Sequence, residues 1–167
     1  MNEKIYIKQL SQDDGIEIFR MLKSIEVNKN GFTNEVNGMS FEEFRKWLTV
    51  QDAWSHGNEL PENYVPQSTF WLYVNDIPIG YGKIRHHISD YLLKNGGTVG
   101  YSISKEHRGK GYGTEFLRLL LEKAKLIGVD EIVLTILKKN IPSISVAENN
   151  GGVRVEKDAD WFYYYFS

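Results

Sequence analysis

One stretch of the sequence, residues 98–137, constrains the fold more than any other. It begins with a predicted strand at residues 98–104, passes through a glycine-rich turn, and continues as a predicted helix at residues 112–127. Gly128 supplies the left-handed residue on which many helices end, and residues 132–137 then form a very apolar strand. Such a strand is typical of burial on both faces, and the strand–helix–strand succession favours a parallel crossover. The stretch therefore predicts an α/β protein.

Hydrophobic periodicity and turn residues predict the other elements. Further strands are expected at residues 5–10, 69–74, 77–84, 153–156 and 161–166. Helix starts are expected after Ser11, after Ser40, which forms a capping box with Glu43, and at Asn140. Residues 90–97 are predicted to be a loop. Because most of these strands follow one another as hairpins, we expect a mixed, mostly antiparallel sheet flanked by helices.

Composition limits the possible partners and the compartment. At 167 residues and 41% hydrophobic content, the chain fits a single domain over residues 1–167. Twenty basic and 22 acidic side chains leave a formal charge of -2, so no global positive field is available to hold nucleic acid. The absence of cysteine excludes disulfides, thiolate metal sites and a cysteine nucleophile. Residues 1–10 lack the apolar core of an export signal and no stretch approaches a membrane span, so we expect a cytoplasmic protein without a membrane partner.

The turn before the helix at residues 112–127 has features of a phosphate site. Its sequence, Arg108-Gly109-Lys110-Gly111-Tyr112-Gly113, places bare backbone amides at a helix N-terminus, where N–H groups bind phosphate. Arg108 and Lys110 oppose the helix dipole there, which an anionic ligand would explain. A tight turn with solvated basic side chains is the alternative. The Rossmann fingerprint and the nucleotide P-loop match poorly, because their acidic residue and their lysine are not in place.

These residues resemble the signatures of the GNAT acetyltransferase superfamily. Its first pattern, Arg or Gln, two residues, Gly, one residue, then Gly or Ala, is matched by Arg108, Gly111 and Gly113. Its second segment, in which Asn follows the next strand and starts a short helix, is matched by Asn140, Ser143, Glu148 and Gly151-Gly152. The resemblance covers roughly residues 69–166, where strings such as GKIRHH and GGTVGYSI are similar to a bacterial subgroup of predicted acetyltransferases. The N-terminal part matches only in outline.

The resemblance implies two central parallel strands that splay apart to admit acetyl-CoA as co-substrate, without a metal. Its pantetheine chain would lie along Tyr101, Ser102 and Ile103, and an N–H near Ile103 would polarise the thioester carbonyl. Arg108 would begin the turn whose backbone N–H groups hold the pyrophosphate, which comprises Gly109, Lys110, Gly111, Tyr112, Gly113 and Thr114. Asn140 and Ser143 would touch pantetheine from the far side.

The resemblance also implies direct attack on the thioester by a primary amine of a small molecule or peptide. Two positions depart from the family: Ala147 stands where many members carry a tyrosine acid, and Thr135 where some carry an acidic base. Ser143 is therefore the candidate proton donor to the thiolate, with a plain helix cap as the alternative. His86 is the candidate base, with a structural or surface histidine as the alternative. Tyr101 is a third candidate for the catalytic site.

The acceptor side and the assembly leave further alternatives open. Three carboxylates scattered among aromatic residues are expected either to hold a cationic amine or to be solvated: Asp52, Glu59 and Glu62, among Trp47, Trp54 and Tyr64. As an exposed edge, the apolar strand at residues 161–166 would favour association, and a homodimer contact could cover it. The alternatives to an N-acetyltransferase are transfer of another acyl group, a non-catalytic acyl-CoA-binding sensor or interaction module, and a nucleotide-binding regulator.

Overall fold

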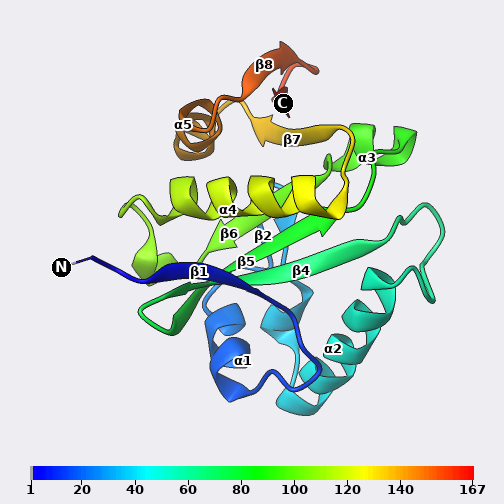
Figure 1. Ribbon diagram of the computed structural model, residues 1–167, viewed down its shortest axis with the longest axis vertical. Helices are drawn as coiled ribbons and strands as arrows, with labels where there is room; N and C mark the ends of the chain where they lie inside the picture. The colour runs from blue at the N-terminus through cyan, green and yellow to red at the C-terminus, as the bar shows by residue number, and fades with distance from the viewer. Residues whose placement is uncertain (1) are drawn as a thin grey trace.

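The fold is described for residues 2–167 by a computed structural model (Figure 1). Up to the glycine-rich turn, the elements are β1 (Ile5–Gln9), α1 (Ile16–Lys23), β2 (Asn28–Lys29), β3 (Phe32–Thr33), the 3-10 helix η1 (Glu35–Gly38), α2 (Phe41–Ser55), β4 (Gln67–Val74), β5 (Ile77–Arg85), α3 (Asp90–Asn95), β6 (Val99–Ile103) and the 3-10 helix η2 (Lys105–His107). The turn is followed by α4 (Tyr112–Ile127), β7 (Ile132–Leu137), α5 (Ile141–Asn149), β8 (Val153–Glu156) and β9 (Trp161–Phe166). The helix expected at residues 112–127 and the strand expected at residues 132–137 are confirmed.

A four-stranded antiparallel sheet, in the order β1-β4-β5-β6, forms one part of the fold. Helices α1 and α2 cover one face, and α4 covers the other (Figure 1). Side chains of β4 and β5 therefore enter two different cores. Trp71 and Tyr81 pack with residues of α1 and α2, whereas Phe70 and Leu72 pack with α4 residues such as Phe116. Burial on both faces explains why these two strands are apolar at most positions.

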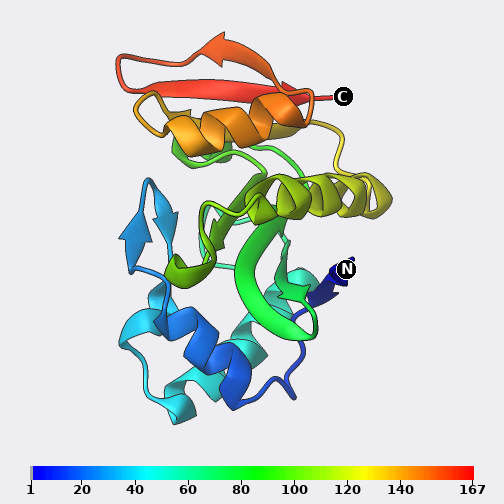
Figure 2. The same ribbon diagram turned by 90° about the vertical axis from the view of Figure 1, so that its left-hand side faces the viewer.

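The second sheet has three antiparallel strands in the order β7-β9-β8, and α5 lies between it and α4 (Figure 2). The strand at residues 161–166 is not an exposed edge, because β9 runs between β7 and β8 and pairs with both. The outer strands are β7 and β8, and the four residues of β8 are all exposed. The structure therefore gives no reason to expect a homodimer contact that covers β9.

The two sheets touch at one end only. The N–H of Thr98 donates to the carbonyl oxygen of Val133 at 2.8 Å, and the N–H of Val133 donates to Oγ1 of Thr98 at 2.9 Å. Gly97 forms an isolated bridge with Leu134. These contacts lie near the starts of β6 and β7, and no ladder joins the two strands further along in residues 2–167. The strands therefore diverge from their junction, as the resemblance implied.

Helix α1 begins later than the sequence pattern predicts. Its N-cap is Gly15, which provides no side-chain hydrogen bond. Ser11 does not cap the helix, because its N–H donates to the Asp14 carboxylate at 2.8 Å and closes a separate turn. The same Asp14 oxygen accepts from Nε1 of Trp71 at 2.8 Å. A partner 57 residues away thus fixes the local structure at this position.

Three further segments test the local sequence signals. Residues 90–97, expected to be a loop, contain α3, whose N-cap Ser89 accepts a hydrogen bond from the N–H of Leu92. The capping box of Ser40 and Glu43 at the start of α2 is confirmed, with both of its hydrogen bonds present. The short hairpin β2–β3 was not expected. Strong capping signals were therefore reliable, and short elements were missed.

Gly97→Ala tests the junction between the sheets. Gly97 has φ +77°, and a Cβ there would lie 2.4 Å from the carbonyl oxygen of Val133. Backbone strain and this collision both oppose alanine, so we expect the free energy of unfolding to fall by about 3 kcal/mol. Gly128→Ala is the matched control, because Gly128 has φ +97° but no atom within 4 Å of its Cβ position, and it should cost about 1 kcal/mol. Equal losses in urea denaturation would contradict the role of this contact.

Candidate functional site

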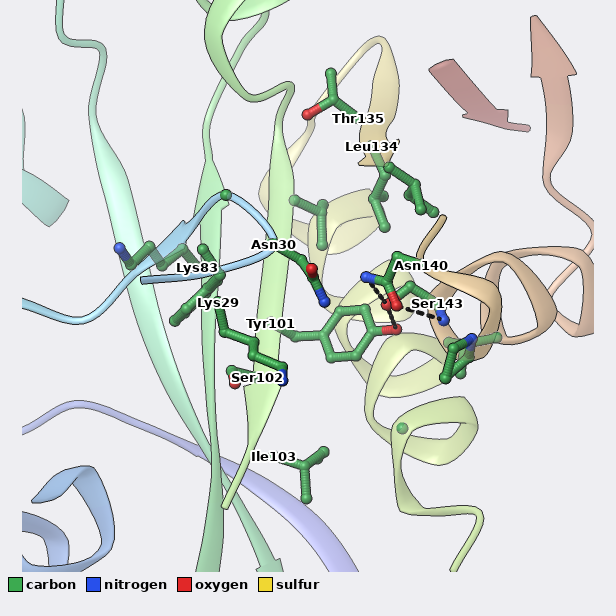
Figure 3. Close-up of a pocket in the computed structure, with 18 of the residues that line it drawn as sticks. Lys29, Asn30, Lys83, Tyr101, Ser102, Ile103, Leu134, Thr135, Asn140 and Ser143 are labelled. Carbon is green, nitrogen blue, oxygen red and sulfur yellow. Dashed lines mark hydrogen bonds between the residues drawn. The ribbon is translucent and has the colours of Figure 1, made fainter. Parts of the chain in front are cut away.

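A cavity of about 810 Å³ opens where β6 and β7 diverge. One side is formed by the turn before α4 and the start of α5, and the other by β5 and the β2–β3 hairpin. Figure 3 shows Lys83 and Asn30 on one side of Tyr101, and Asn140 and Ser143 on the other. The cavity is therefore lined from both faces of the four-stranded sheet.

The free edge of β6 directs backbone groups into this cavity. The N–H of Ser104 donates to Ile79 of β5 at 2.8 Å, so Ser102, two positions earlier, also faces β5. Tyr101 and Ile103 consequently direct their backbone N–H and C=O groups to the other side, where β6 has no strand partner. Both residues line the cavity. The edge can therefore bind an extended ligand through hydrogen bonds like those between strands.

The glycine-rich turn presents bare backbone to the cavity. Gly109 and Gly111 have left-handed backbones, with φ +76° and +85°, and a Cβ on either would meet no atom within 4 Å. Gly111 is also the N-cap of α4 and offers no side chain to the first-turn N–H groups. These amides and the helix dipole form an anion site. The other predicted turn residues that line the cavity are Tyr112, Gly113 and Thr114, and Lys110 does not line it.

Arg108 is bonded within the protein. Its Nη1 and Nη2 donate to the two carboxylate oxygens of Glu26 at 3.1 and 2.7 Å, and its Nε donates to the carbonyl oxygen of Ile103 at 2.9 Å. The hydrogen bonds from Arg108 lower the pKa of Glu26 to about 2. The positive charge at this helix start is thus balanced by Glu26 and does not require a ligand. Although Arg108 lines the cavity, it chiefly ties the segment after α1 to the end of β6.

Three predicted residues converge on one hydroxyl group. Nδ2 of Asn140 lies 3.0 Å from Oγ of Ser143, and the hydroxyl of Tyr101 lies 3.4 Å from the same oxygen (Figure 3). Because Oγ of Ser143 accepts from both partners, its own proton is free to be donated into the cavity. Asn140 also caps α5 by accepting from the N–H of Ser143. Burial raises the pKa of Tyr101, which keeps this phenol protonated.

The structure does not bring His86 to the cavity. Its Nε2 lies 2.7 Å from Oγ of Ser68 on β4, and neither residue lines the cavity. Partial burial lowers the pKa of His86. Thr135 of β7 does line the cavity but carries no titratable group, and Ala147 is fully buried in the core. The geometry therefore gives no support to His86 as the base.

Two basic side chains that the sequence analysis did not select, Lys83 and Arg85, line the β5 side of the cavity. Lys83 is only 7% exposed, and its Nζ donates to the carbonyl oxygen of Thr33 at 2.8 Å and lies 4.7 Å from the ring centre of Phe32. Burial lowers its pKa to about 8. Burial also lowers the pKa of Arg85, whose Nη1 donates to the carbonyl oxygen of Gly97 at 3.3 Å. The sequence did contain a signal for these two residues, because charged side chains at alternate positions of an otherwise apolar strand are unusual.

A second cavity, of about 560 Å³, adjoins the first and shares Thr33, Lys83 and Arg85 with it. Its walls include the aromatic side chains that were expected on the acceptor side: Trp47, Trp54 and Tyr64. The carboxylates expected there line neither cavity: Asp52, Glu59 and Glu62. The expected wall for a cationic amine therefore has its aromatic part but lacks those acidic groups.

Comparison with known protein families decides the class of this site. Residues 4–153 match the family described as the acetyltransferase (GNAT) domain. The chain belongs to the GNAT acetyltransferase family. The predicted family, the acyltransferase class and the α/β fold with helices flanking an antiparallel sheet are thereby confirmed.

Solved structures share the GNAT fold. RimL, an alpha-N-protein acetyltransferase in complex with coenzyme A, has a TM-score of 0.73 and 14% identity over 97% of this chain and 93% of its own. The Campylobacter jejuni N-acetyltransferase PseH, in complex with acetyl coenzyme A, has a TM-score of 0.63 and 12% identity over 98% of this chain and 99% of its own. The uncharacterized N-acetyltransferase YobR of Bacillus subtilis (strain 168) is 39% identical over 51 residues, which are 30% of this chain. The match spans only 21% of YobR.

None of the helices within residues 2–167 combines the length and the apolar character needed to cross a membrane. The same residues contain no group of three or more His, Cys, Asp or Glu side chains placed to hold a metal ion.

Lys83 should give the ligand-free GNAT protein a pH signature. Its pKa is about 8 when folded, below the ordinary value of 10.5, so the folded state binds fewer protons between these two pH values. The cost of burying the charge is fully present below pH 8, and stability gains on the order of 3 kcal/mol as the pH rises to 10.5. Lys83→Met removes this titration. As the pH rises across that range, the wild type should therefore gain stability relative to Lys83→Met. A difference in unfolding free energy that stays constant with pH would contradict the lowered pKa.

Proposed function

We propose that this protein is an N-acetyltransferase that moves the acetyl group of acetyl-CoA to a primary amine of a small molecule or peptide in a ternary complex. The observation that carries the proposal is the cavity between β6 and β7, which is lined from both faces of the sheet. A thioester from the α4 side and an amine from the β5 side can meet in it. The coenzyme A and acetyl coenzyme A in the RimL and PseH structures support the choice of co-substrate.

The residues on the α4 side fit acetyl-CoA. The bare amides around Gly109 and Gly111 suit its pyrophosphate, and the unpaired edge at Tyr101 suits the amides of pantetheine. The N–H of Ile103 points into the gap and can polarise the thioester carbonyl, a contribution of about 3 kcal/mol in other acyl transferases. Ser102 contributes its side chain only, because its backbone faces β5. The proposal includes no metal ion.

The chemistry is a direct displacement. The amine nitrogen forms a bond to the acetyl carbon and releases one proton, and the carbon–sulfur bond breaks. Ser143 donates its Oγ proton to the departing sulfur and regains a proton from the nitrogen, so the products are the amide and the free thiol. Asn140 and Tyr101 hold the serine oxygen while this happens. An amine of pKa about 10.4 must first lose a proton. Since no Asp or Glu among the described residues lines the cavity, that proton leaves to water.

Calorimetric titration with acetyl-CoA, CoA, ATP and NAD tests the proposal before any acceptor is known. Selective binding of acetyl-CoA and CoA, followed by thiol release with an amine panel, is the expected result. Binding of acetyl-CoA without turnover on any amine would favour the non-catalytic sensor. Tighter binding of ATP or NAD would favour the nucleotide-binding regulator, and a folded protein that binds no CoA would contradict the proposal.

Gly111→Asp tests the pyrophosphate site. The new carboxylate would stand at the helix N-terminus where phosphate is expected, so we expect the affinity for CoA to fall at least tenfold, or about 1.4 kcal/mol. Gly111→Asn is the matched control, since it has the same shape and the same strain at φ +85° without the charge. Calorimetry should show a much smaller loss for the asparagine variant. Equal affinities of the aspartate and asparagine variants for CoA would contradict phosphate binding at this turn.

Ser143→Ala tests the proton donor. Loss of a general acid typically lowers turnover about 100-fold or more, and we expect kcat to fall while the KM for acetyl-CoA changes little. Tyr101→Phe keeps the serine but removes one of its two donors, so its kcat should fall less. Steady-state thiol release measures both variants. An unchanged kcat in Ser143→Ala would contradict its role as proton donor, and Ser143 would then have only a structural role at the start of α5.

A further inference from the structure

The charged side chains that line the cavity between β6 and β7 are all basic. They are Lys29, Lys83, Arg85, Arg108 and Lys139, and no Asp or Glu of residues 2–167 lines it. Two of them share Glu26, which lies 2.7 Å from Arg108 and 3.5 Å from Lys29. Lys139 is exposed to solvent. The positive charge that remains away from solvent belongs to Lys83, which is buried, and to Arg85, which is partly buried.

Lys83 and Arg85 act as a pair because they lie two residues apart on β5 and so project from the same face. Each makes one hydrogen bond to a backbone carbonyl, to Thr33 and to Gly97 respectively. A guanidinium carries five N–H donors in a planar fork, so most of the donor capacity of Arg85 is unused. Such a fork fits a carboxylate or a phosphate through two parallel hydrogen bonds.

The acidic side chains of the adjoining cavity are bonded elsewhere. Oε1 of Glu35 accepts from Nε1 of Trp47 at 3.1 Å and from the hydroxyl of Tyr81 at 3.0 Å. Glu43 accepts from the N–H of Ser40 in its capping box. No ion pair within 4.0 Å joins either carboxylate to Lys83 or Arg85 in the described part of the chain. Burial lowers the pKa of both cations, and the charge of Glu35 acts in the opposite direction on both. One carboxylate that makes no direct ion pair with them does not balance two cations, so the pair keeps a net positive charge that an anion from outside can balance.

The phosphates of CoA are poorly placed to be that anion. Lys83 and Arg85 share the face of Tyr81, which packs with α1 and α2, whereas the glycine-rich turn leads into α4 on the other face. Arg85 contacts Gly97 at the start of β6, while the turn follows the end of that five-residue strand, about 17 Å further along. A ligand on the β5 side is the amine acceptor.

We propose that the acceptor amine carries an oxyanion group, a carboxylate or a phosphate, and that Arg85 binds this group with the help of Lys83. The proposal rests on the acetyltransferase function proposed above and names the chemical class of its acceptor. It replaces the cationic acceptor that the aromatic and acidic residues of the sequence suggested.

Paired ligands test the proposal on the protein saturated with CoA, in which no turnover occurs. Amino acids are compared with their carboxamides, and phosphoethanolamine with ethanolamine, by calorimetry and thermal shift. We expect the anionic member of at least one pair to bind about 10- to 100-fold more tightly. The two sets of pairs distinguish a carboxylate from a phosphate. Equal affinities in every pair, including no binding by any compound, would overturn the proposal.

Variants of the pair assign the effect to its residues. Arg85→Met should lose the preference for the anion, Arg85→Lys should keep part of it, and both should bind CoA like the wild type. Because Arg85 forms no ion pair within 4.0 Å in the described chain, the melting temperature of ligand-free Arg85→Met should be unchanged or higher, whereas a purely structural arginine would lower it. Lys83→Met is the second variant if Arg85→Met fails to fold. Arg118→Met, on the exposed surface of α4, is the matched control and should change none of these values.

The two proposals fail in different ways. If the wild-type protein does not bind CoA, the acetyltransferase proposal is contradicted. If it binds CoA and acetylates neutral or cationic amines as well as anionic ones, only the anionic acceptor is contradicted. If the preference for the anion survives in both Arg85→Met and Lys83→Met, the anion binds elsewhere and the assignment to this pair is overturned.

Discussion

The site depends on a sheet-to-sheet contact that is confined to one end. Thr98 and Val133 exchange hydrogen bonds near the starts of β6 and β7, and no ladder continues from there in the described chain. A continuous ladder would have used the backbone groups of Tyr101 and Ile103, and no cavity would exist between the strands. The close approach at Gly97, which leaves no room for a Cβ, keeps the junction tight while the strands diverge. The interrupted pairing is thus what makes ligand binding possible.

Charge in this protein is organised locally, which the net charge of -2 conceals. Glu26 neutralises Arg108 beside the turn, so the backbone amides at Gly111 remain as the positive end of the helix, where the proposal places phosphate. On the opposite face, Lys83 and Arg85 form no direct ion pair within residues 2–167, and the charge of one carboxylate, Glu35, acts on both. Two different anion-attracting surfaces therefore lie on the two sides of the gap, one made of backbone and the other of side chains.

The sequence predicted those features that neighbouring residues determine. The bounds of α4 and β7 follow from the left-handed Gly128 and from a continuous apolar run, and the bare turn follows from its glycines. Features fixed by distant partners were missed. The position of β9 between β7 and β8 depends on packing between strands, and the late start of α1 depends on a bond from Trp71 to Asp14. Alternation along β5 places Lys83 and Arg85 on one face, but only the folded structure shows that this face meets the cavity.

The missing base and the unpaired cations can be understood together. Thr135 occupies the position where some relatives carry an acidic base, and no carboxylate among the described residues lines the cavity. A further carboxylate beside Lys83 and Arg85 would repel an anionic acceptor, by about 4 kcal/mol for charges 4 Å apart at an effective dielectric constant of 20. A cavity that selects an anionic amine must therefore do without an acidic base. In the proposed mechanism, deprotonation of the amine then falls to solvent, and Ser143 assists only when the thiolate departs.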